Sequence, residues 1–310
     1  MENIKRTDKI TNAYQGYLKD NDELIKSASG GLCTSISKKI IGGGGVVFGV
    51  AYSDDFRSAH YEIATNFKGL EKFKGSKYIK PELHHDGVFV FESIKTQLDI
   101  GKPVLFVALP CAATSLTRYL GRDCQNLYLI DLICHGVTEN KVEQMFLDEL
   151  EEKYKSKIID FTLRAKPYGW CPFYITAIFE NGNEFERSFN DTDFGYAFGN
   201  YKRYFCTRCI IKKGRHTSDL TIGDFWGITS RDEGYNKDGV SIAFVRTEKG
   251  EKLLSSLDDF ILSKADIDFA LSNNLTVNYQ IPFDMEKRKK IKGLINRMSL
   301  HSAIEKVRNN

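Results

Sequence analysis

The chain has 310 residues, of which 42% are hydrophobic and 27% charged, and its formal net charge is +3 at pH 7. This composition excludes a disordered chain, and the small net charge excludes nucleic-acid binding by bulk positive charge. No apolar stretch is long enough for a membrane span, and residues 1–20 lack the apolar segment of a signal peptide, so we expect a cytoplasmic protein. Seven cysteines, an odd number, fit metal ligation in a reducing compartment better than a set of disulfides.

The first half of the chain alternates between strand-like and helix-like segments. Apolar, β-branched runs predict buried strands at 45–53, 103–109 and 126–133. The intervening and following segments predict helices at 33–41, 88–98, 112–120 and 139–154. This order indicates an α/β core.

The second half has a different pattern. Residues 158–165 look like a strand, and residues 173–189 contain an Asn181-Gly182 turn between alternating runs, which predicts an antiparallel hairpin. From Glu248 onward the pattern is mostly helical and includes a charge run at 286–292, which we interpret as a solvated helix face. The expected fold class is therefore a mixed α+β core, α/β in the N-terminal half, antiparallel in the middle and helical at the C-terminus. We place region boundaries at residues 1–155, 156–260 and 261–310.

Four of the seven cysteines lie where a metal site is expected. Cys111 and Cys134 follow two of the predicted strands, at the strand ends where open α/β sheets bind ligands. Cys206 and Cys209 form a C-x-x-C pair, which can bind zinc, ligate an iron–sulfur cluster or exchange disulfides. One such pair with two single cysteines departs from the two C-x-x-C pairs of a zinc ribbon and favours a cluster. The other three are interpreted as small buried hydrophobic residues: Cys33, Cys124 and Cys171.

Two segments rich in glycine and serine are candidate phosphate sites. The sequence SASGG at 27–31 precedes a helix and can present N–H groups to an anion; an ordinary helix start with Ser29 as N-cap explains it equally well. The sequence KGSKY at 74–78 sets a turn between Lys74 and Lys77, which gives a second possible phosphate contact. The four glycines at 42–45 are interpreted as a flexible connection from helix to strand.

These motifs, taken in order, resemble the coenzyme F420 hydrogenase/dehydrogenase beta subunit family. The resemblance runs from about residue 12 to 250 through SASGG, GVVFGVAY, KGSKY, LPC, DLICHGV, LRAKPYGW, C-x-x-C and SDLTIGDFWGI. It implies an oxidoreductase that carries FAD beside a 4Fe-4S cluster and passes electrons to or from a small-molecule substrate that takes up or donates hydride. The resemblance assigns the cluster to Cys111, Cys134, Cys206 and Cys209, and the flavin to Ser29, Gly30, Gly31, Gly75, Ser76, Lys77 and Tyr78. Region 1–155 would then bind the flavin, and region 156–260 would complete the iron–sulfur site.

The sequence departs from the family pattern in two places. No cysteine-dense, ferredoxin-like segment precedes Cys33, so we expect a separate ferredoxin or a partner subunit to supply electrons. The family's G-T-P-C-Q motif is replaced by Ala-Leu-Pro-Cys-Ala at 108–112, which removes two polar side chains. Neither nucleic acid nor a membrane is an expected partner.

Several polar residues are candidates for roles around the cofactors. His135 and Asp224 are possible catalytic or tuning groups, with loop capping and turn formation as their structural alternatives. A further group of basic residues can neutralise a flavin diphosphate or guide an acidic ferredoxin, or lie on the surface as isolated charges: Arg164, Lys166, Lys212, Lys213 and Arg215.

Two other classes of function fit the same residues. The first is a non-redox binding module in which four cysteines hold a structural zinc ion. The second is a transferase that uses Cys134 as nucleophile with His135 as base, which we place last because adjacent side chains rarely face each other.

Overall fold

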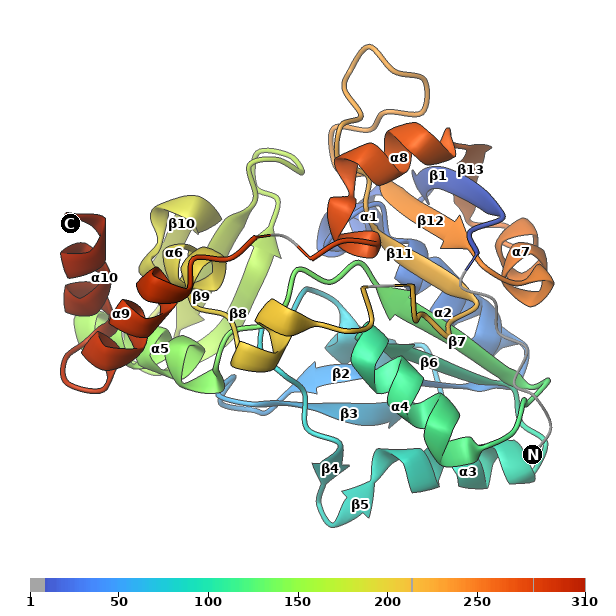
Figure 1. The fold of residues 1–310 in the computed structure, drawn as a ribbon, viewed down its shortest axis with the longest axis horizontal. Coiled ribbons are helices and arrows are strands. Elements are labelled where there is room, and N and C mark those ends of the chain that lie inside the picture. The colour runs from blue at the N-terminus through green and yellow to red at the C-terminus, as the bar shows by residue number, and fades with distance from the viewer. Residues whose placement is uncertain (1–8, 213, 281, 310) are drawn as a thin grey trace.

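The computed structural model describes residues 9–212, 214–280 and 282–309. Its centre is an eight-stranded mixed sheet in the order β13-β1-β12-β11-β7-β6-β2-β3 (Figure 1). The strands are β1 (Asn12–Leu18), β2 (Val46–Tyr52), β3 (Ala59–Ala64), β6 (Val104–Ala108), β7 (Leu127–Leu132), β11 (Leu220–Asp224), β12 (Ser241–Val245) and β13 (Phe260–Lys264). Strands β2, β6, β7 and β11 are parallel, and the others pair antiparallel with their neighbours. The predicted α/β core is confirmed.

Helices cover both faces of this sheet because its central strands are apolar on both sides. All five residues of β6 are buried. Leu105 and Val107 pack with α2 (Leu32–Gly42) and α7 (Glu248–Ser255). Val104 and Phe106, which alternate with them, pack on the other face with α3 (Val90–Asp99) and α4 (Pro110–Leu120).

A smaller antiparallel sheet lies beside the main one, on the left in Figure 1. It consists of β8 (Ile158–Ala165), β9 (Tyr174–Phe179) and β10 (Glu184–Ser188). Its core is shared with α5 (Asn140–Tyr154), α6 (Asp193–Asn200), α9 (Met285–Ile295) and α10 (Leu300–Arg308). The predicted hairpin is confirmed, and Gly182 has the positive φ of 80° that its tight turn requires.

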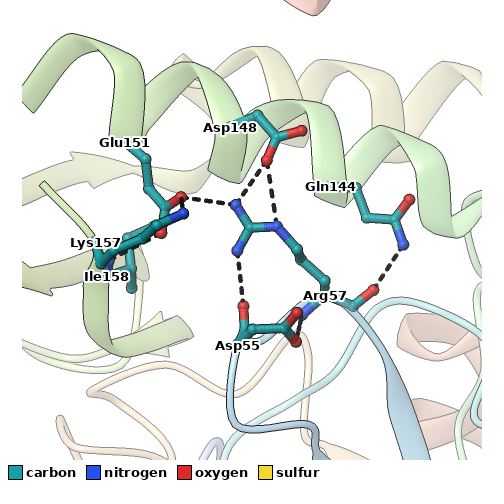
Figure 2. A network of polar contacts seen from close by, with 7 residues as sticks. All are labelled: Asp55, Arg57, Gln144, Asp148, Glu151, Lys157 and Ile158. Carbon is teal, nitrogen blue, oxygen red and sulfur yellow. Dashed lines mark hydrogen bonds and ion pairs between the residues drawn. The ribbon is translucent and has the colours of Figure 1, made fainter. Parts of the chain in front are cut away.

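A polar network joins the β2–β3 hairpin to this second unit (Figure 2). The Arg57 guanidinium lies 2.6 Å from Asp148 and 2.8 Å from Glu151, both on α5. Glu151 also accepts a hydrogen bond from the Ile158 N–H at the start of β8. One arginine therefore links the hairpin of the large sheet to the helix and strand of the small one.

The structure corrects some of the sequence-based expectations for the helical C-terminal part. Residues 260–264, expected to be helical, form β13, and α8 (Ile267–Asn273) follows. The charge run lies on α9 as predicted, but Arg288 within it is buried and donates to the Lys202 carbonyl at 2.6 Å. The other α-helix is α1 (Asn21–Lys26), and two-residue strands form β4 (His84–His85) and β5 (Val88–Phe89). Strand β5 takes the first two positions of the helix predicted at 88–98. Short 3-10 helices are η1 (Lys68–Phe73), η2 (Phe189–Asp191), η3 (Tyr204–Arg208) and η4 (Leu275–Val277).

The region boundaries at 155 and 260 stay a prediction, and the large sheet takes strands from all three expected regions. Within the described ranges, no helix combines the length and apolarity needed to cross a bilayer.

Candidate functional site

Four cysteines meet at one edge of the large sheet. Cys111 lies in the first turn of α4, directly after β6, and Cys134 lies two residues after β7. Because β6 and β7 are adjacent and parallel, their carboxyl ends share this edge. Cys206 lies in the short 3-10 helix η3 (Tyr204–Arg208) and Cys209 follows it. The Cys111 thiol interacts electrostatically with Cys206 and Cys209, and the Cys134 thiol with Cys111 and Cys206.

The loop after β7 packs tightly against η3. Gly136 has a φ of 96°, and a Cβ at this position would lie 3.1 Å from the Cys206 Cβ. The Gly136 N–H donates to the Cys134 sulfur at 3.3 Å. Glycine is therefore required here both for its backbone conformation and for the close approach of the two cysteine segments.

The surroundings favour protonated thiols in the absence of a metal. Burial raises the pKa of Cys134 to about 12, although the Gly136 N–H and the Lys212 ammonium oppose this shift. Burial, followed by Cys206 and Cys209, also raises the pKa of Cys111. A cation that binds these sulfurs must displace their protons, as thiolate-bound metals do.

The spacing of the sulfurs distinguishes two kinds of metal centre. Tetrahedral zinc with bonds of about 2.3 Å holds its four sulfurs within about 4 Å of one another. In the described part of the chain, the one group of three or more ligand atoms within 4.8 Å of one another contains no cysteine. The four thiols are therefore more widely spaced than a single zinc ion holds them.

The two candidate tuning residues have different surroundings. His135 is exposed as a whole residue, although desolvation of its ring, followed by Lys202 and Lys212, lowers the pKa of its imidazole to about 4. Asp224 does not hold a turn. Its carboxylate accepts two hydrogen bonds from Arg164, at 3.0 and 2.9 Å, and one from the Trp170 indole at 3.0 Å.

Arg164 connects the two segments assigned to the flavin. Its guanidinium donates to the Ala28 carbonyl at 2.8 Å, just before Ser29, and to the Tyr78 hydroxyl at 3.3 Å. It also lies 4.0 Å from the centre of the Phe173 ring. Arg164 is 6% exposed. SASGG and KGSKY therefore meet around one buried cation.

The basic residues expected as surface charges are for the most part buried, which corrects that interpretation. Lys166 donates to three carbonyls, those of Leu24, Ser29 and Asp238, and burial lowers its pKa to about 7. Lys212 is 4% exposed and lies near Cys134. Arg215 is exposed, and Lys213 lies outside the described residues.

Ser29 does not cap α2, the helix that follows SASGG. The Ser29 hydroxyl donates to the Val240 carbonyl at 3.0 Å, and Gly31, with a φ of 81°, is the N-cap of α2. No side chain caps this helix start. A Cβ at Gly30 would lie 2.4 Å from the Gly16 oxygen, so this glycine is needed for close packing.

The lysines of KGSKY bond protein atoms. Lys77 donates to the Lys74 carbonyl at 2.7 Å and the Lys72 carbonyl at 3.0 Å, and burial lowers its pKa to about 7. Lys74 forms ion pairs with Glu23 at 3.0 Å and Glu71 at 2.7 Å. Gly75 has the positive φ of a turn, 75°, and precedes Ser76.

The three remaining cysteines differ in burial. Cys124 is buried, and Cys33 is half-buried on α2 with its pKa raised by burial to about 11. Cys171 is exposed, so its interpretation as a buried hydrophobic residue is wrong. It lies in the irregular connection between β8 and β9, outside the strand and the hairpin predicted at 158–165 and 173–189.

Comparison with known proteins identifies the family. The family model for the C terminus of the coenzyme F420 hydrogenase/dehydrogenase beta subunit matches residues 101–267, more than half of the chain. The chain belongs to this family. The family comprises hydrogenases and dehydrogenases, so the chain is a subunit of a redox enzyme. Residues 101–267, which the family model matches, include all four clustered cysteines as well as Arg164 and Asp224.

A solved structure shares the fold. The chain is similar in structure to a chain of the F420-reducing nickel–iron hydrogenase complex from Methanosarcina barkeri, with a TM-score of 0.58. The two chains are 14% identical in sequence, and the match covers 92% of each. The search of curated proteins gave no match.

Sequence reasoning missed two features of this site. The Arg164–Asp224 pair joins residues 60 positions apart, and no local pattern indicates such a pair. Lys212 belongs to a basic stretch that looks solvated, yet it is buried. The adjacent Ile211, which is buried, was the available signal.

Proposed function

We propose that this subunit is an iron–sulfur flavoprotein oxidoreductase. It passes electrons between a 4Fe-4S cluster, FAD and a small-molecule substrate that accepts or donates hydride, and a separate ferredoxin or partner redox subunit exchanges electrons with the cluster. The observation that carries the proposal is the meeting of Cys111, Cys134, Cys206 and Cys209 at one sheet edge. These cysteines come from three separate segments, so their proximity is a property of the fold.

The donor set fits a cluster. Four thiols supply the ligands that a 4Fe-4S cluster takes from protein, and among the described residues no three of the four sulfurs lie within 4.8 Å of one another. The buried Lys212 places a positive charge near Cys134, which favours thiolate there. The transferase alternative loses support because no hydrogen bond between the His135 imidazole and the Cys134 sulfur occurs among the described residues, where Gly136 is the donor to this sulfur.

The residues proposed for FAD fit part of what the cofactor requires. The start of α2 has no capping side chain, which leaves its first N–H groups available to a phosphate. The Arg164 Nε is buried, has no hydrogen-bond partner among the described residues, and lies between the two proposed flavin segments. Ser29, Gly30 and Gly31 would hold one side of the cofactor, and Gly75, Ser76, Lys77 and Tyr78 the other.

When bound, FAD exchanges two electrons as hydride and the cluster exchanges one electron at a time. The chain's own contribution is position and charge. The cysteines fix the cluster at the sheet edge, and Arg164 holds the SASGG and KGSKY segments together. The neutral imidazole of His135 can hold one proton and accept another at its two ring nitrogens.

Anaerobic purification followed by analysis of iron, acid-labile sulfide and flavin tests the proposal. We expect about four irons and four sulfides per chain, together with FAD released by acid. Zinc without iron or sulfide would support the structural zinc module instead. Absence of flavin after reconstitution with FAD would refute the flavin part alone.

A further inference from the structure

A histidine–carboxylate cluster lies at the free edge of the large sheet. His60 and Glu62 belong to β3, the edge strand, and His85 belongs to β4 of the β4–β5 hairpin. One ligand atom from each of these three residues lies within 4.8 Å of the other two. The His60 and His85 rings are stacked with their centroids 3.4 Å apart, and the His60 Nε2 lies 2.7 Å from a Glu62 oxygen.

The surroundings leave this cluster one open side. The His60 side chain is 5% exposed, whereas the His85 side chain is 41% exposed, so an ion can enter from solvent on the His85 side. Asp86, at the hairpin turn, has a carboxylate oxygen 3.4 Å from the His85 Nε2. Lys72 binds the second Glu62 oxygen at 3.0 Å and leaves the first one to the histidine side.

The donor set identifies the chemical class of the ion. Two imidazoles and a carboxylate are the protein ligands of many zinc sites, and imidazole disfavours calcium and magnesium, which prefer oxygen. Asp86 or water can supply a fourth ligand. His60 and Glu62 are two positions apart on β3, so both side chains point from the same face of the strand.

The hairpin is short and packs on the core through Leu83 and Phe89, so a metal ion would add a further attachment. Its two strands have two residues each, and isolated two-stranded hairpins are marginal at best in water. Among the described residues, an isolated backbone bridge from His60 to Glu82 connects the segment before the hairpin to the edge of the sheet. A metal ion between His60, Glu62 and His85 would join the hairpin to β3 directly.

We propose that His60, Glu62 and His85 form a binding site for a zinc-type divalent transition-metal ion that fastens the β4–β5 hairpin to the sheet edge. This site is separate from the four cysteines and does not depend on the proposed redox function. The ion takes the place of the proton between the His60 Nε2 and Glu62, and the His85 ring turns out of the stack to complete the ligand set.

Zinc binding to the full chain with its cofactors in place tests the proposal. The protein is dialysed to equilibrium against Zn²⁺, bound zinc is measured by elemental analysis, and X-ray absorption at the zinc edge reports the ligands. Zinc–nitrogen or zinc–oxygen distances of about 2.0 to 2.2 Å separate this site from thiolate-bound zinc at about 2.3 Å. The variants are His85→Ala and Glu62→Gln, with His84→Ala as the matched control because His84 is the adjacent exposed histidine and stacks on Phe89.

We expect one zinc with nitrogen and oxygen ligands in the unaltered chain and in His84→Ala, and an apparent affinity at least about tenfold weaker in the other two variants. Circular dichroism confirms that each variant is folded, and Glu62→Gln serves as the test if His85→Ala is not. Absence of nitrogen- and oxygen-bound zinc, its retention in both variants, or an equal loss in His84→Ala would each overturn the proposal.

Discussion

Replacing Glu143 with glutamine should make the stability of this protein less sensitive to pH. Glu143 lies on α5 and is completely buried, and neither of its carboxyl oxygens has a hydrogen-bond partner among the described residues. Burial raises the pKa of its carboxyl to about 8. The group is therefore mostly protonated in the folded chain at pH 7.

The sign and size of the effect follow from linkage. In the unfolded chain the Glu143 carboxyl has a pKa of about 4.3, so between this pH and about pH 8 the folded state binds more protons than the unfolded state. The contribution of Glu143 to stability is fully present below pH 4 and is lost as the pH rises to 8. One group changes the free energy of unfolding by at most about 1.4 kcal/mol per pH unit, which gives an upper limit of about 5 kcal/mol over this window.

Urea unfolding at pH 5, 6, 7 and 8, followed by circular dichroism, measures this difference. We expect the free energy of unfolding of Glu143→Gln, relative to the unaltered chain, to rise steadily over this series. Glu152→Gln, an exposed change on the same helix, is the control and should follow the unaltered chain. A constant difference between Glu143→Gln and the unaltered chain from pH 5 to 8 would show that the carboxyl ionises normally.

Single serine substitutions should divide the seven cysteines into two groups: loss of Cys111, Cys134, Cys206 or Cys209 should lower iron and acid-labile sulfide, whereas Cys33, Cys124 and Cys171 variants should keep both. Urea unfolding should show that serine costs about 1 to 3 kcal/mol of stability at buried Cys124 and less than about 0.5 kcal/mol at exposed Cys171. A full cluster in a variant of any of the four proposed ligand cysteines would contradict the ligand assignment. Lys77→Glu should release FAD much more readily than Lys289→Glu on α9, measured by flavin content after gel filtration; equal retention would remove Lys77 from the proposed site. Asp224→Asn should lower the free energy of unfolding by about 3 to 5 kcal/mol because it leaves the buried Arg164 charge unpaired, whereas Asp232→Asn at an exposed turn should change it little; a cost below about 1 kcal/mol would contradict the pairing.

The parts of the fold that could be predicted are those with a local signal. The strands at 46–52, 104–108 and 127–132 are buried on both faces and therefore read as continuous apolar runs. Strand β1 was missed because Gly16 and polar residues interrupt its pattern. A Cβ at Gly16 would lie 1.8 Å from the Ile261 oxygen, so the glycine is required by a neighbouring strand that is distant in the sequence.

The candidate site divides in the same way. The strand ends predicted Cys111 and Cys134 as ligands, and the C-x-x-C spacing predicted Cys206 and Cys209; the fold places these four cysteines together. Ion pairing of Arg164 with Asp224 and the use of Lys77 to bond carbonyls depend on tertiary packing, which leaves no periodic trace in the sequence. The His60–His85 contact was missed for the same reason, because it joins an edge strand to a short hairpin.

The position of β1 has a consequence for synthesis on the ribosome. This strand emerges among the first residues of the chain, yet both of its sheet partners, β12 and β13, are made more than 200 residues later. During translation the edge of β1 that pairs with β12 therefore lacks its partner until residue 245 has left the ribosome, and the other edge lacks β13 until residue 264 has left. The sheet therefore cannot close from the N-terminus alone. Nascent chains released before residue 241 would leave both edges of β1 open, so we expect chaperones to bind β1 and C-terminally truncated chains to aggregate.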